Sequence, residues 1–168
     1  RHPRVWVLCD DIYEHILFDG AKFATFAEAA PEMFDRTLTV NGVSKAYAMT
    51  GWRIGYGGGP QRLIKAMGKV QSQVTHAPSS IGQAAAVAAL EGPQELVAER
   101  SHLFQQRRDF VAAALNRIPG LSVHLPQGAF YVFPSCAGAI GKRTPQGQVI
   151  ASDKDFAHYL LAAEGVAV

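Results

Sequence analysis

The sequence has few cysteines, no excess of charge of one sign and no long apolar run. Its two cysteines, Cys9 and Cys136, lie far apart and form no CxxC or Cys/His spacing. This favours unpaired thiols in a reducing compartment over a secreted disulfide framework. The 16 Lys and Arg residues nearly balance the 14 Asp and Glu residues, and no basic stripe stands out. Nucleic acid and anionic membrane are therefore poor partner predictions, and we expect a cytoplasmic protein that binds small molecules.

Signals for a membrane span, a leader or a metal site are lacking too. No apolar run reaches the length of a membrane span, and the chain begins at Arg1 without an initiator Met or an apolar leader. The missing Met predicts a fragment. The six histidines show no paired-ligand spacing, so no metal is predicted. With 168 residues, of which 48% are apolar and 18% charged, the chain is long enough to bury a core.

Apolar patterning predicts an α/β organisation. Short β-rich runs predict strands over 5–9, 37–40 and 52–56, the first buried on both faces of a parallel sheet. Helical spacing predicts a short helix near 26–30, a helix over 61–74, and a further helix that follows the cap Ser79-Ser80 and runs through Ala84 to Leu90. A long amphipathic helix is expected from Gly92-Pro93 to Asn116. Strands over 121–125 and 129–133, a loop over 134–152, a helix from its cap Asp153 to Glu164 and a strand beginning at 165–168 complete the prediction.

A lysine follows the second predicted strand. Lys45 ends the run Gly42-Val43-Ser44-Lys45, and Arg53 comes eight residues later. A lysine at a strand end beside glycine and serine can be held in a partly desolvated pocket, where the ammonium form is disfavoured and the amine can attack a carbonyl. The alternative is an ordinary exposed loop lysine.

Asp10 and Tyr13 follow the first predicted strand, at the edge where open α/β sheets bind ligands. A carboxylate there can pair with a protonated ring nitrogen, and a phenol can pair with a ring hydroxyl. The fork of donors on Arg53 suits a phosphate, although an isolated arginine is more often a surface ion-pair partner. Together these residues fit a ligand with an aldehyde, a ring nitrogen, a ring hydroxyl and a phosphate, which is pyridoxal 5′-phosphate.

Two stretches, 7–15 and 39–56, closely resemble the class I aminotransferases of fold type I, and most strongly the prokaryotic aspartate aminotransferase group. Residues 77–83, 127–131 and 164–168 also resemble segments of that group, so the resemblance covers essentially the whole chain. It implies the C-terminal part of the aminotransferase large domain, a mostly parallel sheet with covering helices, joined by a long helix to an α+β small domain. The implied division is 1–92 for part of the large domain, 93–117 for the interdomain helix and 118–168 for a partial C-terminal small domain.

The resemblance also implies roles for individual residues. Lys45 matches the family lysine that binds the cofactor aldehyde covalently and later moves the substrate α-proton. Asp10 matches the acid that keeps the pyridine nitrogen protonated, Tyr13 the tyrosine that hydrogen-bonds the ring hydroxyl, and Arg53 the phosphate-binding arginine. Ser44 is expected either to touch the phosphate or to support the turn. Some relatives carry a phosphate-binding serine where this chain has glycine, at position 42.

The implied activity is transfer of an amino group between aspartate, or a related amino acid, and a 2-oxo acid such as 2-oxoglutarate, in a protein that is usually a homodimer. The alternatives are a pyridoxal-phosphate β-lyase or synthase of the same fold, or a non-catalytic aminotransferase-like sensor domain. In the family, a glycine-rich phosphate loop, a ring-stacking aromatic residue and an asparagine precede the segment that begins at Arg1. The arginine that grips the substrate carboxylate follows the position of Val168. We therefore expect the 168 residues alone to be inactive.

Overall fold

The computed structural model of this protein describes residues 2–168 and divides into two compact units. The first unit takes in the chain up to Phe104 together with Gln127–Ala129, and the second comprises Gln105–Pro126 and Phe130–Val168. All the predicted site residues lie in the first unit.

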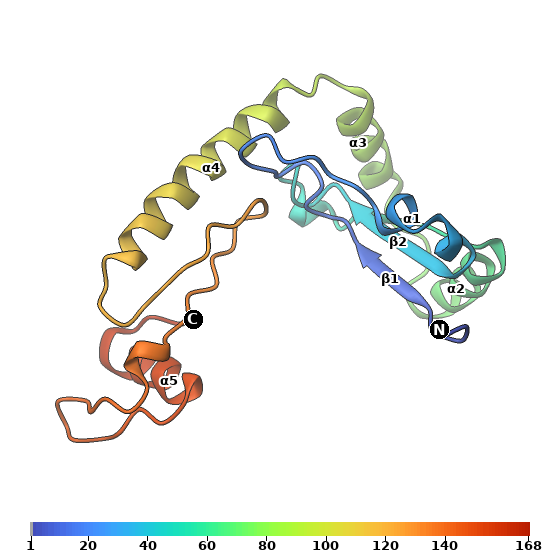
Figure 1. The fold of residues 1–168 in the computed structure, drawn as a ribbon. Coiled ribbons are helices and arrows are strands. Elements are labelled where there is room, and N and C mark those ends of the chain that lie inside the picture. Colours follow the sequence, from blue (N-terminus) through green and yellow to red (C-terminus); the bar gives the residue numbers. More distant parts are fainter. Residues whose placement is uncertain (1) are drawn as a thin grey trace. The chain divides into compact units, whose positions relative to one another are not determined.

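A sheet of three strands organises the first unit, with β1 (Val7–Asp10), β2 (Thr37–Gly42) and β3 (Gly55–Gly58) in that order (Figure 1). β1 is parallel to β2, and Asp10 is paired with Val40. β2 is antiparallel to β3, and Gly42 is paired with Gly55. The carboxyl ends of β1 and β2 and the start of β3 consequently lie at the same edge of the sheet.

The first two strand predictions are confirmed, and the third was placed too early. Thr50–Trp52 forms a 3-10 turn, η2, and Arg53 adopts a left-handed conformation with φ of 55°, so that pairing starts only at Gly55. The expectation of a mostly parallel sheet is wrong for this chain, since one of its two strand pairs is antiparallel. The expected burial of the first strand on both faces is wrong as well. β1 has a single neighbour in the sheet, and the Leu8 side chain is 66% exposed.

Two helices of the first unit, over 26–29 and 80–91, begin at a side-chain cap. The predicted short helix is α1 (Phe26–Ala29), where the Glu28 amide donates to the Thr25 hydroxyl, and the 3-10 helix η1 (Pro31–Arg36) follows it. α2 (Gln61–Val74) and α3 (Ser80–Glu91) confirm the predicted helices, and Ser79 caps α3 by accepting from the Gly82 amide at 3.4 Å. The small core joins Val43, Ile54 and Ala86, so α3 packs against the segment that follows β2.

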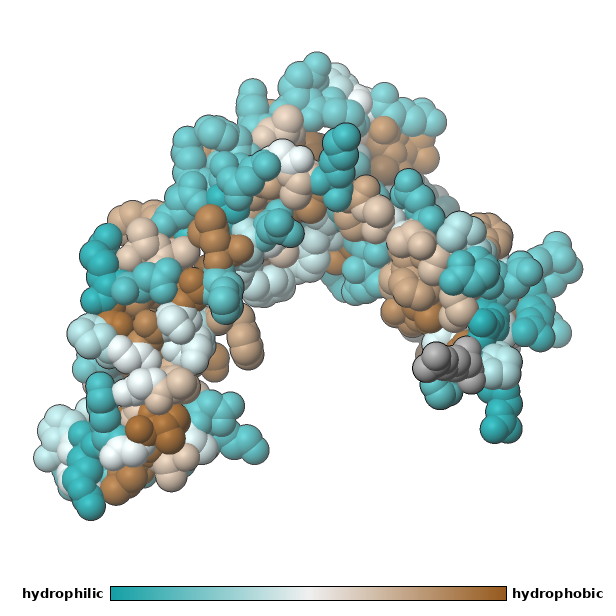
Figure 2. All heavy atoms as spheres, viewed as in Figure 1, coloured by the Kyte–Doolittle hydropathy of each residue, from teal (hydrophilic) through white to brown (hydrophobic). Residues whose placement is uncertain are grey.

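The predicted long helix is α4 (Glu95–Asn116), 22 residues without interruption. The division between the two units falls within it. Its expected amphipathic packing is wrong for this chain, because Leu96, Leu103 and Phe110 are exposed while Arg108 and Ala112 are buried. Apolar side chains also reach the surface elsewhere among hydrophilic ones (Figure 2).

The two strands predicted over 121–125 and 129–133 do not form. A single antiparallel bridge joins Ser122 to Ser135, with N–H to O distances of 3.0 and 2.7 Å. Pro126 and Pro134 have no N–H to donate, which limits a longer ladder. Irregular backbone and the short 3-10 helix η3 (Ala137–Ala139) fill most of the predicted loop.

The last helix, α5 (Asp153–Glu164), is confirmed, but its cap is Ser152 rather than Asp153. The Asp155 amide donates to the Ser152 hydroxyl at 3.2 Å. Gly165 ends the helix in a left-handed conformation with φ of 67°, and its amide donates to the Leu161 carbonyl. The predicted strand at 165–168 does not form. Within residues 2–168, no helix is both long and apolar enough to cross a membrane.

Candidate active site

The edge of the sheet described above collects the predicted site residues. Asp10 ends β1, and the Asp11 amide continues the parallel pairing by donating to the Val40 carbonyl at 2.9 Å. Ser44 and Lys45 follow the end of β2, while Arg53 comes just before β3. Residues that are up to 43 positions apart in the sequence, Asp10 and Arg53, therefore reach one edge because of the strand register.

Two successive turns after β1 place Tyr13. The Glu14 amide donates to the Asp11 carbonyl, and the Ile16 amide donates to the Tyr13 carbonyl, both at 2.9 Å. Tyr13 is half-buried in the turn, whereas Asp10 remains exposed. The segment 127–129 lies against the end of this turn, since the Ala129 amide donates to the Ile16 carbonyl and the Phe18 amide to the Gln127 carbonyl.

Lys45 lies in a tight turn between buried neighbours. Val43 and Ala46 are 0% and 3% exposed, while Ser44 and Lys45 are half-buried. The Ala48 amide closes the turn by donating to the Lys45 carbonyl at 3.2 Å, and Ala48 itself has φ of 55°. The lysine thus leaves a backbone that is fixed by the core on both sides of it.

At Gly42, where the turn that carries Lys45 begins, the backbones of β2 and β3 approach each other closely. A Cβ on Gly42 would lie 2.9 Å from the Ile54 carbonyl oxygen and 3.2 Å from the Gly55 Cα. Any larger residue at this position would need a shift of the backbone here, so the glycine is a packing requirement of this chain.

Arg53 is exposed beside the lysine turn. Its Nη1 donates to the Thr50 carbonyl at 2.7 Å, which orients the guanidinium on its own loop. Ser44, Lys45 and Arg53 do not line the cleft described next.

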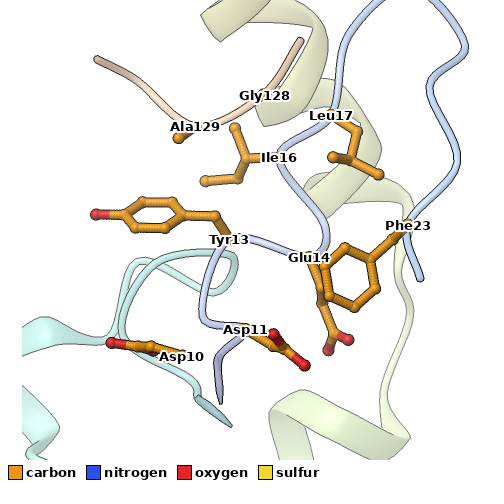
Figure 3. A pocket seen from close by; sticks show the side chains of 9 residues that line it. All are labelled: Asp10, Asp11, Tyr13, Glu14, Ile16, Leu17, Phe23, Gly128 and Ala129. Carbon is orange, nitrogen blue, oxygen red and sulfur yellow. The ribbon is translucent and has the colours of Figure 1, made fainter. Parts of the chain in front are cut away.

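A shallow cleft of about 180 Å³ opens beside the first turn. Its lining combines carboxylates, a phenol and apolar groups: Asp10, Asp11, Tyr13, Glu14, Ile16, Leu17, Phe23, Gly128 and Ala129. Figure 3 shows the Asp10 and Tyr13 side chains extending in one direction, with the Asp11 and Glu14 carboxylates on the opposite side near Phe23. Pockets that enclose a small molecule usually measure about 300–1,000 Å³, so this cleft by itself is smaller than such a pocket.

The electrostatics of the edge centre on Glu14. Burial, then the Glu14 and Asp10 carboxylates, raise the pKa of Asp11, whose Oδ2 is buried and accepts no hydrogen bond from residues 2–168. Burial and the Glu14 carboxylate also raise the pKa of Tyr47, and the same two causes, with Tyr47, raise the pKa of Tyr56. Both phenols are therefore protonated at physiological pH.

Sequence reasoning missed Glu14 and Asn41. The Asn41 amide nitrogen donates to Glu14 Oε1 at 2.9 Å, and the Asn41 amide oxygen accepts from the Gly42 N–H at 2.7 Å. Nothing in the sequence distinguishes Glu14 from a solvated turn acid, because the contact joins residues 27 positions apart. Among residues 2–168, no group of three or more His, Cys, Asp or Glu side chains is arranged to hold a metal ion.

The fold and the residues at this sheet edge are those of a known protein family. The sequence profile of the aminotransferase class I and II family matches residues 1–168, and the chain belongs to that family.

Several named relatives are similar along the whole chain. An aspartate aminotransferase from Rhizobium meliloti strain 1021 is 61% identical over all 168 residues, and an aspartate/prephenate aminotransferase from Cereibacter sphaeroides is 54% identical. These matches cover 41% and 42% of the two relatives. The chain therefore spans about two fifths of the length of the curated relatives it matches.

Solved structures agree with the fold. The crystal structure of the Rhizobium meliloti aspartate aminotransferase superposes with a TM-score of 0.95, covering 100% of this chain and 42% of that one, at 61% identity. An aromatic aminotransferase from Pyrococcus horikoshii has a TM-score of 0.82 at 36% identity, covering 98% of this chain and 41% of its own. The chain thus has the aminotransferase fold, in the form of a partial sheet with helices.

Proposed function

We propose that this chain is the lysine-bearing part of a pyridoxal-phosphate-dependent transaminase that moves an amino group between aspartate, or a related amino acid, and a 2-oxo acid such as 2-oxoglutarate. The observation that carries the proposal is the gathering of Asp10, Tyr13, Lys45 and Arg53 at one sheet edge by the register of β1, β2 and β3. The names of the similar enzymes support the substrate class.

The donor set suits the cofactor in kind. The edge offers a carboxylate, a phenol, a half-buried amine and a guanidinium, which are the partners needed for a ring nitrogen, a ring hydroxyl, an aldehyde and a phosphate. Asp10 would hold the proton on the ring nitrogen, and Tyr13 would hydrogen-bond the ring hydroxyl. Arg53 would bind the phosphate, with Ser44 either contacting it or supporting the turn.

When bound, pyridoxal 5′-phosphate supplies an electron sink that stabilises negative charge on the substrate α-carbon. Lys45 Nζ would bind the cofactor aldehyde covalently, and its amine, once released by the substrate, would take the proton from the α-carbon. The buried neighbours Val43 and Ala46 fix the backbone from which this amine extends. Such a site is expected to work by a ping-pong scheme.

The proposal assigns domains as well. Residues 1–92 would belong to the cofactor-binding large domain, 93–117 to the interdomain helix and 118–168 to part of the small domain. The cleft beside Tyr13 includes neither Lys45 nor Arg53 in its lining, so residues 2–168 do not by themselves enclose all the proposed cofactor-binding groups, and we propose that the 168 residues alone are inactive. We also propose a cytoplasmic homodimer as the working form.

The decisive experiment is reductive trapping in the full-length protein that carries these residues. The protein is incubated with pyridoxal 5′-phosphate, reduced with borohydride and mapped by peptide mass spectrometry. A pyridoxyl group on Lys45, lost in Lys45→Ala but kept in a control Lys65→Ala on α2, is the expected result. A folded protein without an adduct on Lys45 would contradict the proposal and favour a non-catalytic domain.

Kinetics separate the reaction types. A transaminase turns over aspartate only when a 2-oxo acid acceptor is present, so product formation should vanish without 2-oxoglutarate. Turnover that persists without any acceptor would instead indicate a lyase of the same fold.

A further inference from the structure

A set of polar contacts, here called the relay, lies around the turn over residues 42–47. It consists of Glu14, His15, Asn41, Tyr47 and Gln94, and Glu14 contacts both Asn41 and His15. On the near side, Glu14 Oε1 accepts from Asn41 Nδ2 at 2.9 Å, and the Asn41 side-chain oxygen accepts from the Gly42 N–H at 2.7 Å. The Asn41 side chain thereby ties Glu14 to the backbone that leads into the lysine turn.

On the far side, the same carboxylate oxygen lies 3.2 Å from His15 Nε2. The His15 ring meets the Tyr47 ring edge to face, with centroids 6.2 Å apart. The Tyr47 hydroxyl donates to Gln94 Oε1 at 2.9 Å, and Gln94 Nε2 donates to carbonyls at the end of α3, including Gly92 at 2.7 Å. Tyr47 is two residues beyond Lys45, so these contacts hold the C-terminal end of the turn in place.

We propose that Glu14 is a positioning residue, which holds the Gly42–Tyr47 turn through Asn41 and His15 so that Lys45 presents its amine in one orientation. This inference rests on the proposed cofactor function of Lys45. The raised pKa of Tyr47, caused by burial and then by the Glu14 carboxylate, agrees with a phenol that stays protonated and donates to Gln94. Glu14 acts through its neighbours and is not itself expected to touch substrate.

The residue type matters for this role. A carboxylate oxygen carries several lone pairs, so Glu14 Oε1 can accept from the Asn41 amide while the His15 ring lies 3.2 Å from the same oxygen. Charge-assisted hydrogen bonds are also stronger than neutral ones. Glu14→Gln keeps one side-chain oxygen as an acceptor for Asn41, whereas Glu14→Ala removes both branches.

The test uses the full-length protein and counts pyridoxyl label on Lys45 after borohydride reduction at a fixed, subsaturating pyridoxal 5′-phosphate concentration. Glu14→Ala is expected to lower this label about tenfold, the size expected for losing one or two hydrogen bonds that orient a group. Label on the exposed Lys22 and Lys65 should not change. Glu14→Gln should recover Lys45 labelling to within about threefold of the parent. Glu32→Ala, an exposed acid in η1, is the matched control and should behave as the parent does.

Two results would overturn the proposal: labelling of Lys45 in Glu14→Ala within about twofold of the parent, or equal impairment of Glu14→Gln and Glu14→Ala. If Glu14→Ala fails to fold, Asn41→Leu tests the proposal instead. This variant removes the hydrogen bonds of Asn41 to Glu14 and to the Gly42 N–H, and it is expected to show the same loss of label on Lys45. Normal labelling of Asn41→Leu would refute the relay.

The failure of the proposed function is distinguishable from failure of this inference. No label on Lys45 in the parent refutes the cofactor assignment alone. Hydrogen exchange of the backbone amides over 43–48, measured without cofactor, then tests the relay. Faster exchange in Glu14→Ala than in Glu32→Ala supports it, and equal exchange overturns it.

Discussion

Gly42→Ala offers a direct test of how the lysine turn is built. The Cβ of the new alanine would meet two backbone groups, the Ile54 carbonyl oxygen at 2.9 Å and the Gly55 Cα at 3.2 Å. Neither is the end of a flexible side chain that could turn away. Gly42 and Gly55 are paired across β2 and β3, and Ile54 is 8% exposed within the small core.

The strand pair must therefore open by several tenths of an ångström, or the core around Ile54 must shift. Forcing extra atoms into a packed site typically costs about 1–3 kcal/mol. We expect a loss in that range, together with weaker trapping of pyridoxal 5′-phosphate on Lys45, because the displaced backbone leads directly into its turn.

The assay is urea unfolding of the full-length protein without cofactor, followed by far-UV circular dichroism, with Gly58→Ala as the matched control. Gly58 lies in the same strand, β3, and a Cβ there would have nothing within 4 Å. The control should leave the unfolding midpoint unchanged or raise it slightly, because replacing glycine restricts the unfolded chain. A midpoint for Gly42→Ala that equals or exceeds that of Gly58→Ala would refute the close-approach argument.

Three further outcomes are expected. Arg108→Met should lower the unfolding midpoint of the full-length protein, by about 1.5–3 kcal/mol in free energy, because the buried guanidinium donates to the Pro126 carbonyl at 2.8 Å; an unchanged midpoint would contradict this. Ser152→Ala should speed hydrogen exchange in the first turn of α5 by about fivefold, for a cap contribution of about 1 kcal/mol, whereas Asp153→Ala should have the smaller effect; the reverse order would make Asp153 the cap. The raised pKa of Asp11 means that the folded state holds its proton more tightly, so stability from this group falls as pH rises from the unfolded value of 3.8 through the folded pKa. Asp11→Asn should accordingly be more stable than the parent at pH 7, with the gain shrinking towards pH 3.8 in urea titrations; a gain that is independent of pH would contradict the assignment.

The sequence predicted best those elements whose signals are local. The bounds of α2 follow from helical spacing between Pro60 and Thr75, and α3 begins where Ser79 supplies a cap. Asp10 was found as a candidate for the same reason, since it directly follows the apolar run 5–9. These features need no information from distant parts of the chain.

The misplaced elements depend on contacts that the sequence does not display. The third strand was expected from Trp52, but the left-handed Arg53 delays pairing until Gly55. The alternation over 121–133 predicted two strands, yet only the Ser122–Ser135 bridge forms. Alternating apolar residues indicate which side chains are buried. They form a β-ladder only where a neighbouring strand supplies the partners for the backbone hydrogen bonds.

The same distinction explains why the motif residues were found and Glu14 was not. Asp10, Tyr13, Lys45 and Arg53 are recognisable because their chemistry suits one ligand, whereas the role proposed for Glu14 depends on the Asn41 contact that the parallel register creates. A shift of β1 by one residue against β2 would turn alternate side chains to the opposite face and separate Glu14 from Asn41. In the proposed function, the register of β1 on β2 and the close Gly42–Gly55 pair therefore matter for the site as well as for stability. They are the physical reason that the turn carrying Lys45, 35 residues after Asp10 in sequence, begins at the sheet edge where Asp10 ends β1.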